Sequence, residues 1–323
     1  MNGKPRSGSA AGSPDRDFLI GVLCILISSL GFALNQSFSN ALGDRAGVFE
    51  KMFLHNLVGV VIFGAILLRK GISFLGREPA LLFWRAFLGF LSTLFVVAAT
   101  TFSSRPLFEL GVLTSTSAIF TMVTAAVWLR ERVGRAQYLV VLVCFLGVLV
   151  TVRPSPALFA DPFCLFALGG AAFGGAAYCV VRRLRDAAHP YTVVFAYCAL
   201  SAAFALPFYL VGEAGRGGPR EPRDLLYMMG MGLGVCVGQL FLNLAYRRAE
   251  ASRLSPYSYV QNVYTLIISL AVFHQSIPVY SYIGAALILG ANYMNLRLGR
   301  KECGKDGMIH GGNGKEAAGG ALR

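Results

Sequence analysis

One short segment carries the densest set of polar side chains within an apolar part of the chain. It reads "SPYSYVQNVYT", and Tyr257, Gln261 and Tyr264 are spaced at i, i+4 and i+7, which places them on one face of an α-helix. Tyr259 and Asn262 form an adjacent stripe. Aromatic rings and amides together bind polar, partly aromatic solutes by stacking and hydrogen bonding. A competing interpretation places tyrosines at a lipid–water interface. It explains Tyr257 but not Gln261 or Asn262, which lie further along the segment.

Other polar residues extend the same candidate binding site. Gln239 and Asn243 are spaced at i and i+4 and would form part of one wall. Asn35 and Gln36 in "GFALNQSF" correspond to Tyr178 in "GGAAYCVV" at an offset of 143 residues. Polar positions related by an internal repeat favour a cavity on a pseudo-two-fold axis. The alternative is hydrogen bonding between helices, worth about 0.6 kcal/mol on average in membranes.

Two basic or titratable side chains interrupt apolar runs. Arg85 in "LFWRAFLGF" is either an anchor for an anion or carboxylate, or an arginine that extends to the interface beside Trp84. His55, next to Asn56, could bind substrate or titrate near neutral pH. A hydrogen-bonded structural histidine is the other interpretation of His55.

The carboxylates available for proton coupling are few. Glu109 follows "RPLF" and could carry a proton or bind a cation, or it could be a first-turn carboxylate favoured by the helix dipole. Glu131 lies among arginines in "LRERVGR", which favours ion pairing and a structural role. We keep both residues as coupling candidates.

Several chemistries lack sequence support. There is no H-E-x-x-H or G-x-S-x-G motif, and "GGNGKE" is not a phosphate-binding loop. The seven cysteines include no C-x-x-C pair, so neither a disulfide framework nor a metal site is indicated. The sequence therefore predicts no enzyme activity, no cofactor and no bound metal.

The composition defines the elements that must position these residues. Hydrophobic residues make up 55% of the 323 positions and charged residues only 14%, against about 25% charged in soluble domains. This predicts an all-α integral membrane protein whose partners are lipids and a small-molecule substrate. A helix needs roughly 20 apolar residues to cross a bilayer. Ten windows meet that length: Phe18–Phe38, Val48–Leu68, Pro79–Thr101, Pro106–Leu129, Ala136–Val152, Pro162–Val181, Tyr191–Gly212, Leu225–Tyr246, Ser255–Gln275 and Val279–Leu296.

The distribution of charge predicts the orientation of these windows. The net charge of +13 is better explained by basic loops on one membrane face than by nucleic-acid binding. With both termini in the cytoplasm, 21 of the 29 basic residues fall on the inner side and 7 on the outer side. Residues 1–17 and 299–323 would then be cytoplasmic tails.

The two halves of the chain are related. Leu129 aligns with Phe273, and Glu131 aligns with Gln275, at an offset of 144 residues. Five windows per half is an odd number, so the second half must be inverted relative to the first. Two inverted five-helix repeats are a building plan of secondary transporters, with a substrate site between the halves near the bilayer midplane.

The stretches "LFWRAFLGFLSTLFVVAATTF", "GVLTSTSAIFTMVTAAVWLRERVGR" and "LFLNLAYRRAEASRLSPYSYVQNVYTLIISLAVFHQSIPV" resemble EamA-type members of the drug/metabolite transporter superfamily. The resemblance covers about Phe18 to Leu298, with one unit at 18–153 and an inverted one at 162–298. The family usually has a glutamate at the end of the fourth helix of each unit. Glu131 matches this pattern and Gln275 departs from it. The resemblance implies secondary transport of small metabolites, often export, with both termini cytoplasmic.

Two functions from different classes remain open at the level of sequence. The first is a secondary exporter or exchanger of a small polar or amphipathic metabolite, such as an amino acid or a nucleotide-like compound, working by alternating access. The second is a lipid scramblase or channel on the same scaffold, although neither an acidic ring nor a filter motif occurs. We expect a monomer or homodimer in a bacterial inner membrane.

Overall fold

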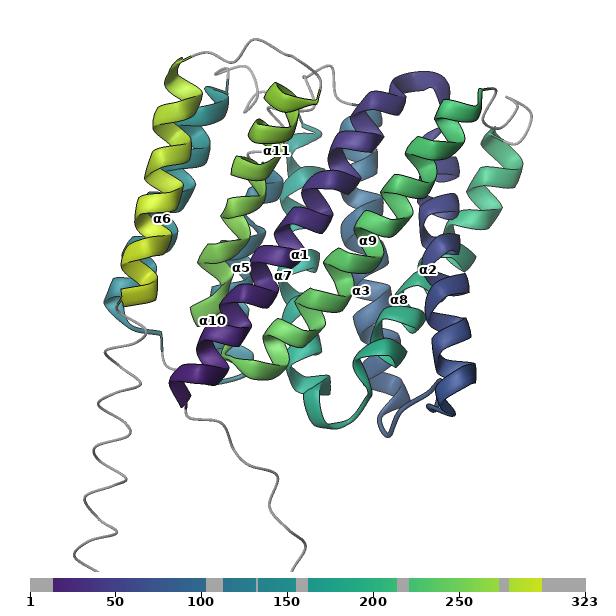
Figure 1. Cartoon of the computed structure of the whole chain (residues 1–323), viewed down its shortest axis with the longest axis horizontal. Coiled ribbons are helices and arrows are strands. Elements are labelled where there is room, and N and C mark those ends of the chain that lie inside the picture. The colour runs from purple at the N-terminus through teal and green to yellow at the C-terminus, as the bar shows by residue number, and fades with distance from the viewer. Residues whose placement is uncertain are drawn as a thin grey trace, which may run out of the picture.

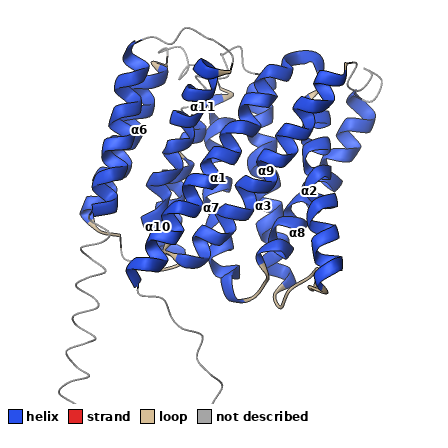
Figure 2. Ribbon diagram, in the orientation of Figure 1, coloured by secondary structure: helices blue, strands red, loops and turns tan. Residues whose placement is uncertain are grey.

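The computed structural model describes residues 14–102, 113–131, 133–154, 162–213, 221–272 and 279–297. Every regular element within these ranges is a helix (Figure 2), as the expected all-α class requires. The coupling candidate Glu109, the tail 299–323 and Gln275, which aligns with Glu131, lie outside the described residues, as does most of the tail 1–17.

The helices follow the chain in the order shown by the colours of Figure 1. Their bounds are α1 Pro14–Leu42, α2 Val48–Lys70, α3 Pro79–Phe102, α5 Ser117–Trp128, α6 Arg135–Val152, α7 Cys164–Arg183, α8 Pro190–Phe208, α9 Pro222–Arg248, α10 Ala251–Leu254, α11 Val260–Ala271 and a last helix over 279–297.

Seven of the described helices are long and apolar enough to cross a membrane. They fall on seven of the ten windows expected from the sequence. The window Pro106–Leu129 is represented by a shorter apolar helix, Leu113–Trp128. The helix 279–297 occupies the last window. The count of ten membrane spans stays a prediction.

The window Ser255–Gln275 differs from the single helix that we expected. The helical path already begins at α10, and a 3₁₀ segment, Ser255–Tyr259, separates α10 from α11. Pro256 lies at the start of this 3₁₀ segment. Proline has no N–H group to donate to the preceding turn, and its ring clashes with a continuing α-helix. The i, i+4, i+7 face drawn through Tyr257 therefore does not exist as a regular α-helical face.

Close helix pairs hold the bundle together. Helix α1 packs along α9, and α3 packs along α7, as Figure 1 shows for the α1–α9 pair. At the first seam, the Ser28 hydroxyl donates to the Gly238 carbonyl at 2.7 Å. At the second, the Ser92 hydroxyl donates to the Gly170 carbonyl, also at 2.7 Å. Small residues at both seams let the backbones approach closely.

Further pairs complete the bundle. Helix α2 packs on α8, α5 on α7, and α11 on α1. At one end of the molecule α6 lies beside the yellow helix 279–297 (Figure 1), where an added Cβ at Gly147 would lie 2.8 Å from the Ile288 side chain. The start of α8 is fixed by Pro190 in its first turn and by His189, whose ring Nδ1 accepts the Tyr191 N–H at 3.3 Å.

Candidate functional site

Arg85 is a fully buried arginine in the interior of the bundle. Its side chain comes from α3, and the residue is only 1% exposed. The interpretation that this arginine extends to the interface is therefore wrong. Buried ionised groups in membrane proteins usually face the protein interior and have a partner or a function.

Two other helices supply the direct contacts of Arg85. Its Nη2 donates to Gln239 Oε1 on α9 at 2.7 Å. Its guanidinium carbon lies 5.0 Å from the ring centroid of Tyr197 on α8, a cation–π contact. Gly89, one helical turn after Arg85, leaves the space that this arrangement needs. A Cβ at Gly89 would come within 2.7 Å of both Arg85 Nη1 and the Tyr197 ring.

The charge of Arg85 has no counter-ion in the described part of the protein. None of the ion pairs formed by the described residues includes Arg85. Its Nε–H is buried and has no hydrogen-bond partner among these residues. A guanidinium carries five N–H donors in a planar fork that matches a carboxylate or phosphate. Arg85 therefore carries donors of the kind that bind anionic groups.

Tyrosines and an amide surround this guanidinium. Tyr178 on α7 and Tyr246 on α9 lie close enough to Arg85 to interact with it electrostatically. The two rings have centroids 5.8 Å apart. Asn243, one turn after Gln239, is 1% exposed, and its Oδ1 has no donor among the described residues. Aromatic faces, amides and one cation thus meet at the junction of α3, α7, α8 and α9.

The site lies part of the way into the bundle. Arg85 is six residues after the start of α3, and Gln239 is nine residues before the end of α9. At about 1.5 Å per residue, these positions are roughly 9 to 14 Å from the helix ends.

Glu131 is held by a helix start on the other half of the chain. Its carboxylate accepts the Ala251 N–H at 3.1 Å, the Ser252 N–H at 2.9 Å and the Ser252 hydroxyl at 2.7 Å. Its cationic partner among the described residues is Arg182 of α7, at 3.7 Å, rather than a neighbour in sequence. Glu131 therefore acts as a cap for α10.

The next three predicted site residues, Asn35, Gln36 and His55, come from α1 and α2. The Asn35 amide donates to the Met231 carbonyl at 3.1 Å and joins α1 to α9. Gln36 is exposed. His55 is buried, and its Nε2 lies 3.1 Å from the Asn56 amide nitrogen. These contacts match the helix-packing alternative for Asn35 and the structural alternative for His55.

The polar residues around α11 fall into two groups: Tyr257 and Tyr259 in the 3₁₀ segment are buried, and Gln261 and Asn262 in α11 are half-buried. Tyr257 is 3% exposed and packs in a cluster with Tyr246, which contradicts the interfacial interpretation of Tyr257. Tyr259 is 1% exposed, and its hydroxyl has no partner among the described residues. The Asn262 amide donates to the Ser115 hydroxyl at 3.4 Å, and Gln261 is half-buried.

Sequence reasoning missed two members of the Arg85 cluster, Tyr197 and Tyr246. Tyr197 lies within an apolar window, so the criterion that selected Tyr178 would also have selected it. Tyr246 is the last residue of the window Leu225–Tyr246 and directly precedes Arg247 and Arg248. Among the described residues, no group of three or more His, Cys, Asp or Glu side chains could hold a metal ion.

Seven of the described helices are apolar and long enough to cross a membrane, which identifies the chain as an integral membrane protein. Comparison with known proteins gives its family. The family model for the EamA-like transporter family matches residues 19–153 and 162–297. The chain therefore belongs to the EamA-like transporter family.

Individual relatives are more distant. The pseudopaline exporter CntI of Pseudomonas aeruginosa is 23% identical over 248 residues, covering 76% of this chain and 84% of the exporter. The riboflavin transporter of Vibrio cholerae is 29% identical over 191 residues, covering 57% of this chain and 60% of that protein. A crystal structure with 21% sequence identity superposes with a TM-score of 0.74 and covers 88% of this chain and 99% of its own. At this identity, the superposition shows the fold alone.

Proposed function

We propose that this transporter is a secondary exporter or exchanger that moves a small polar or amphipathic metabolite with an anionic group by alternating access. The observation that carries the proposal is Arg85. It is a buried guanidinium with one hydrogen bond and no carboxylate partner among the described residues. Removing a charge from water is costly, and a bound carboxylate or phosphate would offset that cost.

The helix pairing supports an arrangement of two inverted five-helix repeats. If α1 corresponds to α7, and α3 to α9, the α1–α9 pair of one half is the counterpart of the α7–α3 pair of the other. The contacts of α5 with α7 and of α11 with α1 are related in the same way. Inverted repeats place the substrate site between the two halves, where Arg85 of the first and Gln239 of the second meet.

The orientation follows from the basic residues. Arg69, Lys70, Arg182, Arg183, Arg247 and Arg248 all lie in the last turns of α2, α7 or α9. We place these ends and both termini in the cytoplasm by the positive-inside rule. The relatives reported above are bacterial, which supports a bacterial inner membrane.

The substrate class follows from the side chains around Arg85. Tyr178, Tyr197 and Tyr246 present ring faces, and Gln239 and Asn243 present amides. This set fits an anionic or zwitterionic solute with a planar part, as in amino acids and nucleotide-like metabolites. The relatives are named for pseudopaline and riboflavin, two different solutes, so the family alone does not fix the substrate.

The remaining candidates take secondary roles in this proposal. Tyr257, Tyr259, Gln261 and Asn262 stay candidates for a second wall of the binding site. Gln36 stays a candidate for substrate contact, whereas the described hydrogen bonds of Asn35 and His55 favour structural roles. Glu109 and Glu131 remain the candidates for proton coupling. The cap that Glu131 makes for α10 gives it a structural role as well.

The test is counterflow in liposomes of neutral lipid that contain the purified full chain. Labelled amino acids, nucleosides, S-adenosylmethionine and cationic drugs are offered with and without a pH gradient. We expect saturable counterflow of an anionic or zwitterionic solute that is lost in Arg85→Gln. It should be kept in Arg69→Gln, a control that removes the same charge from an exposed residue at the end of α2.

The unfolding temperatures of the variants separate a binding role from a folding role. Arg85→Gln removes an uncompensated buried charge, so its unfolding temperature should be equal to or higher than that of the wild type. Loss of flux with a strongly lowered unfolding temperature would make Arg85 structural. Lipid flipping or ion leak in place of saturable flux would overturn the proposal in favour of a scramblase or channel.

A further inference from the structure

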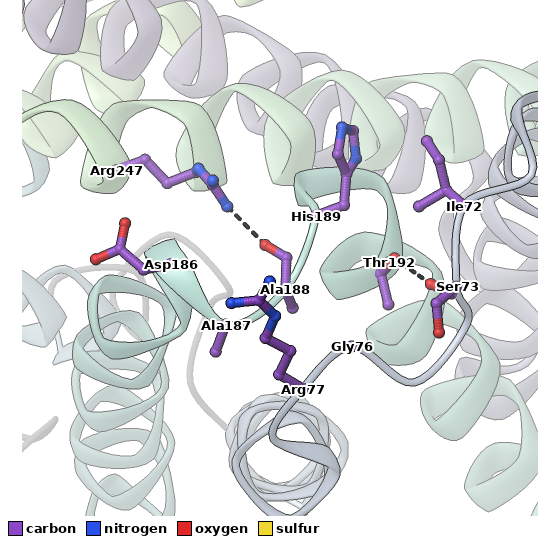
Figure 3. Close-up of a pocket in the computed structure, with 10 residues that line it drawn as sticks. All are labelled: Ile72, Ser73, Gly76, Arg77, Asp186, Ala187, Ala188, His189, Thr192 and Arg247. Atoms are coloured by element: carbon purple, nitrogen blue, oxygen red, sulfur yellow. Dashed lines mark hydrogen bonds between the residues drawn. The ribbon is translucent and has the colours of Figure 1, made fainter. Parts of the chain in front are cut away.

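A second candidate binding site lies at the end of the bundle where α2 ends and α8 begins. A pocket of about 300 Å³ opens there, and its lining includes Arg77, Asp186, His189 and Arg247. Figure 3 shows these side chains around the short segment that precedes α8. The volume is at the lower end of the range for small-ligand sites, which is roughly 300 to 1,000 Å³. None of the side chains of the Arg85 site lines this pocket.

Two hydrogen bonds and one close backbone approach fix the walls of the pocket. The Arg77 N–H donates to the Ala187 carbonyl at 2.8 Å. The Thr192 hydroxyl donates to the Ser73 carbonyl at 2.7 Å. Gly76 adopts a φ of +63°, and a Cβ there would lie 2.9 Å from the Ala188 Cβ. The loop after α2 is therefore held closely against the segment before α8.

The charge on the walls is predominantly positive. Among the described residues, the Arg77 guanidinium makes neither a hydrogen bond nor an ion pair. Arg247 uses Nη1 to donate to the Ala188 carbonyl at 2.6 Å, which turns its guanidinium toward the pocket (Figure 3). The acid in the lining, Asp186, is paired with the Arg185 Nε at 2.8 Å. Neither Arg77 nor Arg247 forms an ion pair with Asp186, although Asp186 lies close enough to Arg247 to interact with it electrostatically.

We propose that this pocket binds a phosphate-type anion between Arg77 and Arg247. The planar guanidinium fork matches the oxygens of a phosphate and binds them through charge-assisted hydrogen bonds. Arg77 and His189 are both exposed, so a ligand can reach the pocket from outside the bundle. The anion is either the head group of an acidic phospholipid or a free phosphate.

Basic pockets between membrane helices on the cytoplasmic side favour acidic lipid head groups over zwitterionic ones. The pocket lies beside the ends of α2 and α9, where the basic residues Lys70, Arg247 and Arg248 gather. An acidic head group there would join the loop after α2 to the start of α8. The proposal concerns binding alone and does not depend on the transport function proposed for the Arg85 site.

The test uses the purified full chain in neutral detergent and measures its unfolding temperature. Three probes are added separately over a concentration series: inorganic phosphate, dioleoylphosphatidylglycerol and dioleoylphosphatidylcholine. The variants are Arg77→Gln and Arg77→Lys, with Arg69→Gln as the matched control. Arg69 is exposed in the last turn of α2, near the same end of the bundle, and does not line the pocket.

We expect a saturable rise in unfolding temperature with an anionic probe and none with phosphatidylcholine. Arg77→Gln should weaken the apparent affinity by about tenfold or more, because it removes charge-assisted hydrogen bonds to the anion. Arg77→Lys should retain part of the affinity, and Arg69→Gln all of it. A response to phosphate alone identifies a soluble ligand, whereas a response to phosphatidylglycerol alone identifies a lipid head group.

Two results would overturn the proposal. One is the absence of a saturable rise with either anionic probe. The other is an equal loss in Arg77→Gln and Arg69→Gln, since that would show attraction to the basic surface as a whole rather than binding in the pocket. Arg77 is exposed and its side chain has no partner among the described residues, so its replacement leaves the fold intact.

Discussion

Arg85 depends on a small residue beside it. Gly89 lies one turn along α3 and faces both the guanidinium and the Tyr197 ring, each at 2.7 Å from where a Cβ would be. The side chains of Arg85 and Tyr197 must therefore move to make room for any larger residue. Their cation–π geometry, with 5.0 Å between guanidinium and ring centroid, depends on this glycine.

Gly89→Ala should consequently impair substrate binding without a change in charge. We expect the KM for the transported solute to rise by about tenfold, equivalent to roughly 1.4 kcal/mol. Gly290→Ala is the control, because a Cβ at Gly290 meets no atom within 4 Å. Initial rates of counterflow over a substrate series measure the effect. An unchanged KM in Gly89→Ala would show that the Arg85–Tyr197 contact does not form part of the binding site.

His189 should make stability depend on pH. Partial burial and the nearby charges of Arg247 and Lys70 hold the pKa of His189 below its ordinary value of 6.5. Arg77 and Asp186 also line the same pocket. The unfolded chain takes up a proton as the pH falls through about 6.5, while the folded protein resists it. This residue therefore lowers the stability of the fold as the solution is acidified from pH 7 to pH 5.

The measurement for His189 is the unfolding temperature between pH 5 and pH 8. In His189→Gln the decline toward acid pH should be shallower than in the wild type, whatever the offset caused by losing the ring that accepts the Tyr191 N–H. A saturating anion in the pocket should also flatten the wild-type profile, because it favours the protonated ring. Parallel profiles for the two proteins would contradict this assignment.

Most residues of the Arg85 site could be selected from the sequence, but the sequence did not show which of them lie together. Arg85, Tyr178, Gln239 and Asn243 stand out because each is polar within an apolar run. Which of them meet depends on helix rotation and crossing, and these are set by packing rather than by local pattern. Asn35 and His55 satisfied the same polarity criterion, yet the described hydrogen bond of Asn35 joins α1 to α9, and that of His55 is to its neighbour Asn56 on α2.

Among the elements, α10 is unusual because a side chain far away in sequence caps it. This helix has only four residues, and its first two N–H groups donate to the carboxylate of Glu131. Unsatisfied N–H groups at a helix start are costly when they are buried. Glu131 thereby joins the end of α5 to the segment between α9 and α11.

Glu131→Ala should destabilise the protein. We expect a loss of about 1–3 kcal/mol, the usual cost of leaving buried donors without a partner. Glu221→Ala is the matched control. Glu221 also precedes a helix start, but its side chain makes no cap hydrogen bond, and its ion-pair partner among the described residues is the exposed Arg223. Thermal unfolding of the two variants should show a clear drop for the first and little change for the second. Equal effects would exclude the capping role.

The breaks within the elements were harder to predict than the elements themselves. Hydropathy identified the seven long apolar helices because each is a continuous run of the required length. The 3₁₀ segment after α10 depends on Pro256 and on the Glu131 cap together. The second of these is a tertiary contact between residues 120 positions apart in sequence, and no local pattern encodes it.

On the scale of the whole molecule, the two halves meet at glycine-lined seams. At the α1–α9 seam, a Cβ at Gly31 would lie 2.6 Å from the Gly238 nitrogen and 2.8 Å from the Gly234 oxygen. These are backbone atoms of the facing helix, so the clash can be relieved only if the two helices move apart. The position of α1 against α9 therefore requires a residue without a side chain.

Gly31→Ala should lower the unfolding temperature and the yield of folded protein, despite the better helix propensity of alanine. Gly290→Ala again provides the contrast, because its surroundings are open and only the gain in propensity remains. Size-exclusion profiles in detergent and thermal unfolding measure both variants. Equal unfolding temperatures and elution profiles for the two variants would show that α1 and α9 can move apart without loss of stability.

The charge of Arg85, which has no counter-ion among the described residues, also has a consequence for the kinetics of the transport cycle. If this arginine anchors the substrate, the loaded carrier is locally neutral and the empty carrier is not. Moving one elementary charge through the membrane potential involves about 2.3 kcal/mol per 100 mV, and an unneutralised site is also harder to close away from water. The empty protein should therefore switch slowly between its inward-facing and outward-facing states. Exchange of one solute molecule for another should then outpace net efflux, and only the net flux should respond to voltage.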